Sequence, residues 1–277
     1  FGRCRLQRLA RDGHVVYAGA RRSESAQALA GDGCRPVTLD VTDPAAIERV
    51  VSEIEATHGA IDVLINNAGY SQSGAVERVT PEQMQTQFAT NVFGPMALTQ
   101  RVLPAMRARR RGYIVNISSM GGRLVFPGAG AYHASKYALE ALSDALRFEL
   151  AGFGIHVVLI EPGLIRTTFG ETAASSLDAT AVAETSAPYA YFHSEVARIT
   201  RESYYKGSLA PFASEPSAVA DAVVRAISST HPKERYVVSP SAVLLLGLRR
   251  LLPDTWWDRF LARTYPRPGI GSYRGSA

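Results

Sequence analysis

The chain has 277 residues, of which 46% are apolar and 20% are charged, an ordinary composition for a globular protein that buries a sizeable core. Its net charge of +5 is concentrated in residues 235–277, where seven arginines stand against two acids. Because no stripe of basic and aromatic residues runs along the rest of the chain, we expect no nucleic-acid partner.

Predicted strands and helices alternate through the first half of the chain. Short apolar runs predict strands at 14–20, 35–41 and 61–66, and periodic segments predict helices at 2–12, from Ser23, at 44–58 and at 81–111. Asp43-Pro44 and Thr80-Pro81 are helix starts, since a capping side chain precedes a proline at the first helical position. Gln83 completes a capping box with Thr80, and we expect a bend near Pro95.

The alternation continues in the second half, with strands predicted at 113–118, 156–160 and 235–239 and helices at 131–151 and 216–229. Strands that alternate with helices of this length indicate a parallel sheet covered on both faces. We therefore expect an α/β fold with a doubly wound, Rossmann-like sheet. Residues 1–240 would form a single domain, and 241–277 would form a helical extension of it.

The start of the chain departs from this architecture. A doubly wound sheet begins with a central strand and a glycine-rich turn, whereas here a helix is predicted directly after Phe1-Gly2. We therefore expect the first strand and most of the glycine-rich turn to be missing, and we interpret the chain as N-terminally incomplete. Two strand edges inside the sheet would then be left unpaired.

Tyr132 and Lys136 form a pair suited to proton transfer. Their spacing of four places them one turn apart on the same helix face. A phenol normally has a pKa of about 10, and a nearby ammonium lowers that value toward the working range. Lys136 is one of three lysines in a chain with 27 arginines. The alternative is an ordinary amphipathic helix with a packed tyrosine and a solvated lysine.

Several motifs around this pair resemble the short-chain dehydrogenase/reductase family, and the resemblance covers essentially all of residues 2–240. In the family's order, the motifs are Asn66-Asn67-Ala68-Gly69, Asn91 in Asn91-Val92-Phe93-Gly94, Ser119 after Asn116-Ile117-Ser118, Tyr132 with Lys136, and Pro162-Gly163-Leu164-Ile165-Arg166-Thr167. Each follows a predicted strand or lies in a predicted helix, where ligands bind in such sheets. The segment Ile160-Glu161-Pro162-Gly163 resembles the corresponding segment of the hydroxysteroid and retinol dehydrogenase branch.

The resemblance implies a catalytic set and an oxidoreductase activity. Tyr132 would be the general acid or base, and Lys136 would lower its pKa. Ser119 would polarise the substrate carbonyl, and Asn91 would hold a water that links Lys136 to solvent. Ser118 is expected to face the other side of the strand. The reaction would interconvert an apolar ketone or aldehyde and its alcohol, and the alternative is a non-catalytic dinucleotide sensor or scaffold.

Charge at the end of the strand expected at 14–20, which would be the second strand of a complete doubly wound sheet, favours NADP(H) over NAD(H). A ribose 2′-hydroxyl prefers a carboxylate there, whereas a 2′-phosphate prefers arginine. The strand is followed by Arg21 and Arg22 with no acid. By the resemblance, further contacts to the dinucleotide would come from Gly2, Asp40, Val41, Asn67, Ala68, Gly69, Tyr132, Lys136, Pro162, Gly163, Ile165 and Thr167.

Residues 164–214 correspond to the substrate lid of the family and are rich in aromatic side chains, namely Phe169, Tyr189, Tyr191, Phe192, Tyr204, Tyr205 and Phe212. Aromatic lining suits an apolar substrate such as a steroid, retinoid or lipid-like molecule. The tail at 241–263 is basic and amphipathic. It would either lie on an anionic membrane surface or, as we favour, pack against the protein and close the pocket.

The remaining features of the sequence bear on metal binding, cellular location and oligomeric state. Cys4 and Cys34 and the six histidines show no ligand spacing, so we expect no metal and a reducing compartment. No apolar run is long enough to span a membrane, and no signal peptide is visible. We therefore expect a cytoplasmic protein, with peripheral membrane contact as a further option. The family's habit implies a homodimer or homotetramer through the helices at 81–111 and 131–151.

Overall fold

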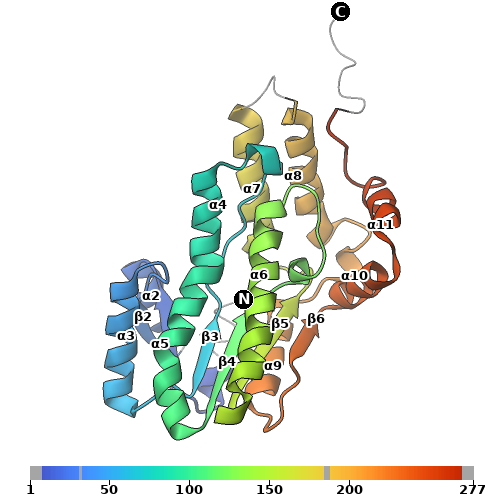
Figure 1. Cartoon of the computed structure of the whole chain (residues 1–277). Helices are drawn as coiled ribbons and strands as arrows, with labels where there is room; N and C mark the ends of the chain where they lie inside the picture. The colour runs from blue at the N-terminus through green and yellow to red at the C-terminus, as the bar shows by residue number, and fades with distance from the viewer. Residues whose placement is uncertain (1–7, 31–32, 184–187, 270–277) are drawn as a thin grey trace, which may run out of the picture.

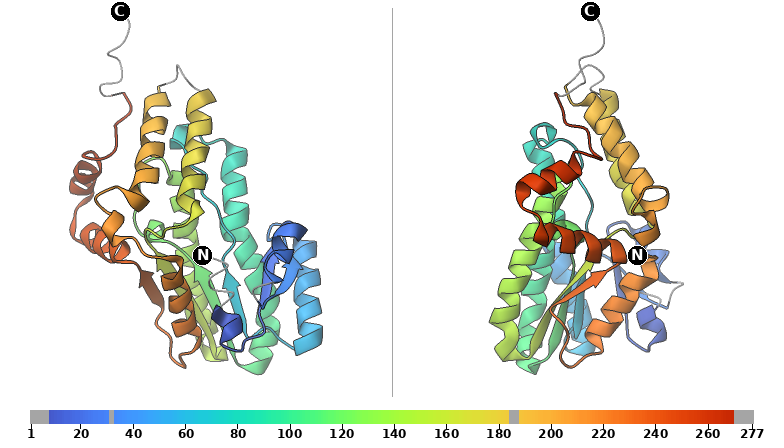
Figure 2. Two further views of the ribbon diagram at one scale, coloured as in Figure 1. Left: turned by 180° about the vertical axis from the view of Figure 1, so that it is seen from behind. Right: turned by 90° about the vertical axis from the view of Figure 1, so that its right-hand side faces the viewer.

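Residues 8–30, 33–183 and 188–269 are described by this computed structural model, and they form parallel strands that alternate with helices. The strands are β1 (Tyr17–Ala20), β2 (Arg35–Thr38), β3 (Val63–Asn66), β4 (Gly112–Ile117), β5 (Ile155–Pro162) and β6 (Arg235–Val238). Every strand pairing is parallel. Helices cover both faces of the strands, with α9 (Pro216–Ile227) on the opposite side from α5 (Gly94–Arg109) and α6 (Gly130–Leu150) (Figures 1 and 2). The predicted α/β class is confirmed.

The strands are divided into two sheets. Among the strands of the described ranges, β1 pairs with β2 alone, and β3 to β6 form a second sheet in chain order. Within the described residues no strand lies between β1 and β3, and a cavity of about 550 Å³ is lined by residues of both, among them Tyr17, Gly19, Leu64 and Asn66. The described chain thus shows the two unpaired strand edges that we expected. Residues 1–7, including Gly2 and most of the helix predicted at 2–12, lie outside the described residues.

The remaining helices are α2 (Ser23–Gln27), α3 (Pro44–His58), α4 (Pro81–Phe88), α7 (Thr168–Ala183), α8 (Ala190–Tyr205), α10 (Pro240–Leu251) and α11 (Asp254–Leu261). Asp43 caps α3 by accepting a hydrogen bond from the Ala45 N–H, and Thr80 and Gln83 form the predicted capping box of α4. Both helices begin at proline, as the sequence predicts.

Several predicted elements differ from the structure. The strand expected at 14–20 begins only at Tyr17, the strand expected at 35–41 ends at Thr38, and the strand expected at 61–66 begins at Val63. The helix expected at 81–111 is interrupted by a π-helical turn at Ala89–Phe93. We expected an irregularity of this helix near Pro95, and the π-helical turn lies just before that proline. A π-turn widens the helix locally and is frequent at functional sites, and it contains Asn91.

Apolar clusters on the two faces of the larger sheet hold the layers together. On one face, Val102, Met106 and Ile114 pack with residues of α3 and α6. On the other face, Val158 and Ile160 of β5 pack with Val223 of α9. Burial of such side chains contributes about 1.5–3 kcal/mol each to stability. The sheet therefore has a fixed orientation relative to α6, which carries Tyr132 and Lys136.

The chain after β5 covers the carboxyl ends of the strands. α7 and α8 lie side by side above the sheet, and α10 and α11 fold back beside them (Figures 1 and 2). Leu245 of α10 and Trp257 of α11 are buried against Met120, Leu124 and Leu164. The tail thus packs on the protein, as we favoured. Among the described helices, none has the length and apolar character needed to cross a bilayer.

Candidate active site

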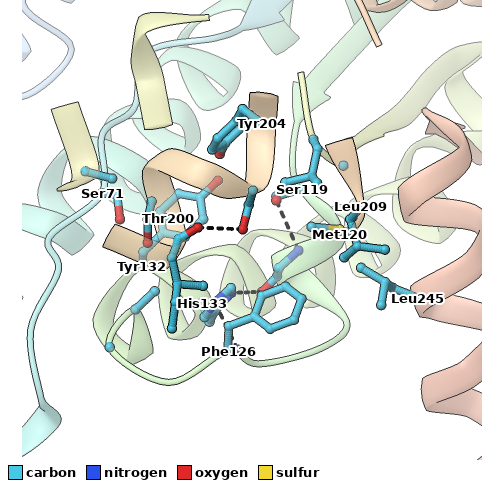
Figure 3. A pocket seen from close by; sticks show the side chains of 18 of the residues that line it. Ser71, Ser119, Met120, Phe126, Tyr132, His133, Thr200, Tyr204, Leu209 and Leu245 are labelled. Atoms are coloured by element: carbon cyan, nitrogen blue, oxygen red, sulfur yellow. Dashed lines mark hydrogen bonds between the residues drawn. The ribbon is translucent and has the colours of Figure 1, made fainter. Parts of the chain in front are cut away.

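A cavity of about 710 Å³ lies at the carboxyl ends of β4 and β5, beneath the lid helices α7 and α8 (Figure 3). It brings together many of the residues singled out from the sequence, namely Asn67, Gly69, Ser119, Tyr132, Lys136, Pro162, Gly163, Ile165 and Thr167. The lining also includes apolar side chains, among them Leu177, Val196, Leu245 and Phe260. A largely apolar lining with a few polar groups is typical of a small-molecule site.

Lys136 is buried beside Tyr132 at the bottom of this cavity. Its side chain is only 6% exposed, and Nζ donates a hydrogen bond of 2.8 Å to the carbonyl oxygen of Ile117 at the end of β4. The ammonium lies 5.8 Å from the centre of the Tyr132 ring. Burial lowers the pKa of Lys136 to about 8, and the charge of Glu140 opposes this lowering. Lys136 therefore remains largely protonated at neutral pH.

The Tyr132 hydroxyl is held in its protonated form. Burial raises the pKa of Tyr132 to about 12, and a hydrogen bond with Ser119 acts in the opposite direction. We expected Lys136 to lower this pKa, but in the protein alone burial raises it and only Ser119 acts against the burial. A protonated phenol in a cavity is a proton donor.

Ser119 and Ser118 have different surroundings. Ser119 Oγ accepts a hydrogen bond of 3.0 Å from the Gly121 N–H and donates one of 3.5 Å to the Pro162 carbonyl. Ser118 Oγ lies against Gly122 on the side of Glu140, where a Cβ added to Gly122 would approach to 2.9 Å. Of the two hydroxyls, only that of Ser119 is hydrogen-bonded with the phenol of Tyr132.

Asn91 is fully buried in the π-turn, and it does not line the cavity directly. Its Nδ2 donates to the Tyr70 carbonyl and to Ser135 Oγ, both at 3.1 Å, and its Oδ1 accepts from the Tyr70 N–H at 3.2 Å. A Cβ added to Gly69 would lie 3.2 Å from Asn91 Oδ1 and 3.8 Å from Lys136 Nζ. Gly69 thus separates the amide of Asn91 from the ammonium.

The residues proposed for the adenosine end lie along the ends of β1 and β2. Arg21 and Arg22 are exposed at the start of α2. Asp40 Oδ1 accepts hydrogen bonds from the backbone and hydroxyl of Thr42, and these bonds, with a smaller contribution from Arg21, hold the pKa of Asp40 below its usual value. Burial raises the pKa of Tyr70, and the charge of Arg21 acts in the opposite direction. Arg21 therefore acts electrostatically on Asp40, which follows β2, and on Tyr70, which follows β3.

The other residues predicted to contact the dinucleotide lie between the adenosine end and the catalytic residues. Asn67, Ala68 and Gly69 are exposed after β3, and Asn67 lines both cavities. Val41 is buried against α5 and lines the cavity between β1 and β3. Thr167 Oγ1 accepts a hydrogen bond from the Phe169 N–H. A backbone without bulky side chains at Gly69 and Gly163, open to the cavity, fits the close approach of a dinucleotide.

Fewer aromatic side chains of the lid line the cavity than we expected. Of the seven aromatic residues noted at 164–214, only Phe169 and Tyr204 line the cavity. Tyr189 and Phe192 pack inside the lid, and Tyr191, Tyr205 and Phe212 are exposed. The missing aromatic surface comes instead from Phe126, Phe260 and Tyr265, of which the last two belong to the tail.

Several site residues were not identified from the sequence. His133 Nε2 accepts from the Phe126 N–H at 3.3 Å, so its Nδ1 carries the proton and donates to the Gly121 carbonyl at 2.9 Å. This ring fixes the loop after Ser119. Glu140 and Glu161 are buried, and both lie against the partly exposed guanidinium of Arg235. The spacing of four from Lys136 to Glu140 was a visible signal for the first of them.

No group of three or more histidine, cysteine, aspartate or glutamate side chains in the described part of the chain could hold a metal ion.

The comparisons with known proteins identify the family of this chain. The family model for short chain dehydrogenases matches residues 1–178. The protein therefore belongs to the short-chain dehydrogenase/reductase family, and it is an NAD(P)-dependent oxidoreductase that acts on CH–OH groups.

An uncharacterized oxidoreductase of Escherichia coli K12, YbbO, is 37% identical over 254 residues, which are 91% of this chain and 87% of the relative. A short-chain dehydrogenase structure from Streptomyces avermitilis is 34% identical, with a TM-score of 0.75 over 95% of this chain and 94% of that one. The closed form of serine dehydrogenase complexed with NADP⁺ is 29% identical, with a TM-score of 0.71 over 86% of this chain and 89% of that chain.

Proposed function

We propose that the protein is an NADP(H)-dependent reductase of apolar ketones or aldehydes, with Tyr132 as the proton donor and the reverse oxidation available when the cofactor is oxidised. The observation that carries the proposal is the protonated phenol of Tyr132 beside Lys136 and Ser119, at the bottom of a largely apolar cavity. Such a cavity suits a substrate of the hydroxysteroid, retinoid or lipid-like class.

The side chains divide the chemistry at the substrate oxygen between them. Ser119 would donate a hydrogen bond to the carbonyl oxygen and polarise it. Tyr132 would transfer its hydroxyl proton to that oxygen as charge develops there, and the Lys136 ammonium would stabilise the phenolate that remains. Asn91 would hold a water that returns the proton from solvent through Lys136. A bound nicotinamide supplies the hydride.

The preference for NADP(H) rests on Arg21, with Arg22 as a second candidate. No acid follows β1 where a ribose 2′-hydroxyl would need one. The carboxylate of Asp40 is already hydrogen-bonded to Thr42, so Arg21 is the better partner for a 2′-phosphate through charge-assisted hydrogen bonds. A solved relative is described as a complex with NADP⁺, which is consistent with this preference.

The remaining contacts would follow the exposed backbone. Asp40 and Val41 would flank the adenine, and Asn67, Ala68 and Gly69 would run beside the adenosine ribose. The nicotinamide amide would bind the segment after β5, at Pro162, Gly163, Ile165 and Thr167. Lys136 would hydrogen-bond the nicotinamide ribose.

The surroundings of the enzyme are also part of the proposal. We infer a cytoplasmic homodimer or homotetramer that pairs through α4–α5 and α6. Phe148 of α6 is 88% exposed, which supports a covered surface there. Val243, Leu251 and Trp256 of the tail are exposed as well, among arginines, which favours transient contact with an anionic lipid surface.

The function is tested by comparing the parent with Tyr132→Phe. The parent should oxidise NADPH in the presence of some members of a panel of long-chain aldehydes, cyclic ketones and steroid ketones. The variant should lose nearly all turnover while its NADPH affinity, measured by fluorescence titration, stays within about twofold. Equal turnover in the two proteins would refute the role of Tyr132.

A further inference from the structure

A row of charged side chains, the first two of them buried, runs along the face of α6 that carries Tyr132 and Lys136. Glu140 follows Lys136 by one turn, and Asp144 follows Glu140 by another, so their side chains share one face. Glu140 is 6% exposed, and Glu161 at the end of β5 is completely buried. Carboxylates this deeply buried are costly unless cations compensate them.

Two arginines provide that compensation. Arg235 Nε lies 3.2 Å from Glu140 Oε2 and 3.0 Å from Glu161 Oε1, and its Nη2 donates to Asp144 Oδ2 at 2.6 Å. Arg123 Nη1 donates to Glu161 Oε2 at 3.0 Å. These bonds connect α6, β5, β6 and the loop after Ser119. They join the elements that carry the catalytic set and the segment at Pro162.

Glu140 occupies the space directly beneath the Ser119 turn. A Cβ added to Gly122 would lie 2.8 Å from Glu140 Cγ, 2.9 Å from Ser118 Oγ and 3.2 Å from the Lys136 carbonyl, so only glycine leaves room for the carboxylate. Burial raises the pKa of Glu140 to about 7; Ser118 and Arg235 lower it, and the charge of Glu161 raises it further. The charge next to Lys136 therefore changes close to neutral pH.

Lys136 needs an anion nearby because its own environment disfavours the charged form. Burial lowers the pKa of Lys136, and the charge of Glu140 raises it. Within the described residues, Nζ donates to the neutral Ile117 carbonyl and to no carboxylate. Without Glu140, the ammonium would lose its proton closer to neutral pH.

We propose that Glu140, anchored by Arg235, is a positioning residue whose charge favours the protonated form of Lys136 beside Tyr132. Glu140 does not line the cavity and acts through Lys136. The charged groups that face it are Lys136 and Asp144 on its own helix, Glu161 on β5 and Arg235 on β6. The proposal rests on the proposed function only for its consequence in turnover. The charge coupling itself can be measured without substrate.

The measurement uses the small number of lysines. Protein labelled with ¹³C and ¹⁵N only at lysine should give side-chain NMR signals from Lys136, Lys206 and Lys233 alone, and Lys136→Met assigns the first. We expect the Lys136 signal of the parent to titrate near pH 8, with a second inflection near pH 7 as Glu140 ionises. In Glu140→Gln the second inflection should vanish, and the midpoint should fall by about one pH unit.

Asp144→Asn is the matched control, because Asp144 also binds Arg235 but lies two turns from Lys136. Both inflections of Lys136 should persist in Asp144→Asn, and the midpoint should shift much less than in Glu140→Gln. Thermal unfolding reports whether each variant is folded. A Lys136 titration that is the same in Glu140→Gln as in the parent would overturn the proposal.

If Glu140→Gln does not fold, the parent alone decides: two inflections support the proposal and a single one overturns it. Turnover separates this proposal from the proposed function. A coupled Lys136 titration in a protein that reduces none of the panel refutes only the function, and an active protein with an uncoupled Lys136 refutes only the role of Glu140. In an active protein, activity should fall as the pH is raised, and in Glu140→Gln this fall should occur at a lower pH than in the parent.

Discussion

Lys136 Nζ donates a 2.8 Å hydrogen bond to the main-chain carbonyl of Ile117, so the end of β4 and helix α6 are joined by the ammonium itself. Ile117 precedes Ser119 by two residues, and Lys136 follows Tyr132 by one turn. The bond therefore sets the position of the ammonium relative to both hydroxyl groups. A compact cation on a flexible stem fits this buried position, whereas a planar guanidinium does not.

Lys136→Arg should therefore inactivate the enzyme even though it conserves the charge. We expect turnover to fall by about 100-fold or more, in the range typical of a lost acid–base contribution, in an assay of NADPH oxidation. Lys206→Arg is the matched control, because Lys206 is exposed after the lid helix α8, and its turnover should equal that of the parent. An active Lys136→Arg would show that the ammonium geometry is unimportant.

Arg21→Gln should weaken NADPH binding and leave NADH binding unchanged. Loss of a charge-assisted hydrogen bond to the 2′-phosphate corresponds to about 1.5–3 kcal/mol, or roughly tenfold or more in affinity. Isothermal titration with both cofactors measures this difference. Arg250→Gln, an exposed change in the tail, should affect neither. Equal losses for NADPH and NADH would contradict the assignment of Arg21.

His133 should make the folded state sensitive to acid. Burial lowers the pKa of His133 to about 4, below the unfolded value of about 6.5. The stability contributed by neutral His133 is therefore present above pH 6.5 and is lost as the pH falls toward 4. Between pH 7 and pH 5 the loss should be about 2 kcal/mol, measured by urea unfolding.

His133→Gln retains an amide donor and acceptor but does not titrate in this range. Its stability should fall less than that of the parent between pH 7 and pH 5. If both proteins lose stability equally, other groups account for the acid sensitivity and the protonation of His133 does not.

Gly94→Ala and Gly247→Ala should have opposite effects on stability. A Cβ at Gly94 would lie 2.6 Å from the carbonyl oxygen of Val41, whereas one at Gly247, in α10, would have no neighbour within 4 Å. We expect the first change to destabilise the protein by about 1–3 kcal/mol. The second should stabilise it by about 0.5–1 kcal/mol through helix propensity. Thermal unfolding of both variants checks this, and a neutral Gly94→Ala would mean that α5 is not tightly packed on Val41.

Local signals predicted much of the fold. The structure begins α3 at Pro44 after the Asp43 cap and ends it at His58, as predicted, because capping and proline placement depend only on neighbouring residues. The π-turn at 89–93 was not predicted, since its sequence is compatible with a regular α-helix. The late start of β1 was also missed, because strand length depends on pairing partners distant in the sequence.

The site shows the same division. Tyr132 and Lys136 could be paired from their spacing, and Ser119 from its motif. By contrast, Glu140 meets Arg235 across 95 residues of chain, and Tyr265 reaches the cavity from the tail. No local periodicity predicts contacts of this kind. The raised pKa of Tyr132 likewise depends on how many atoms surround the ring, which only the folded structure provides.

The most direct test of the central claim follows hydride transfer with a deuterium label and asks whether it depends on the hydroxyl of Tyr132. The parent and Tyr132→Phe would be mixed in a single turnover with NADPH deuterated at nicotinamide C4 and a carbonyl compound that the parent reduces, and the alcohol would be analysed by mass spectrometry. The account predicts deuterium on the carbinol carbon with the parent and almost no alcohol with the variant, although the variant still binds the cofactor. Deuterated alcohol formed by Tyr132→Phe at the parent's rate would contradict it.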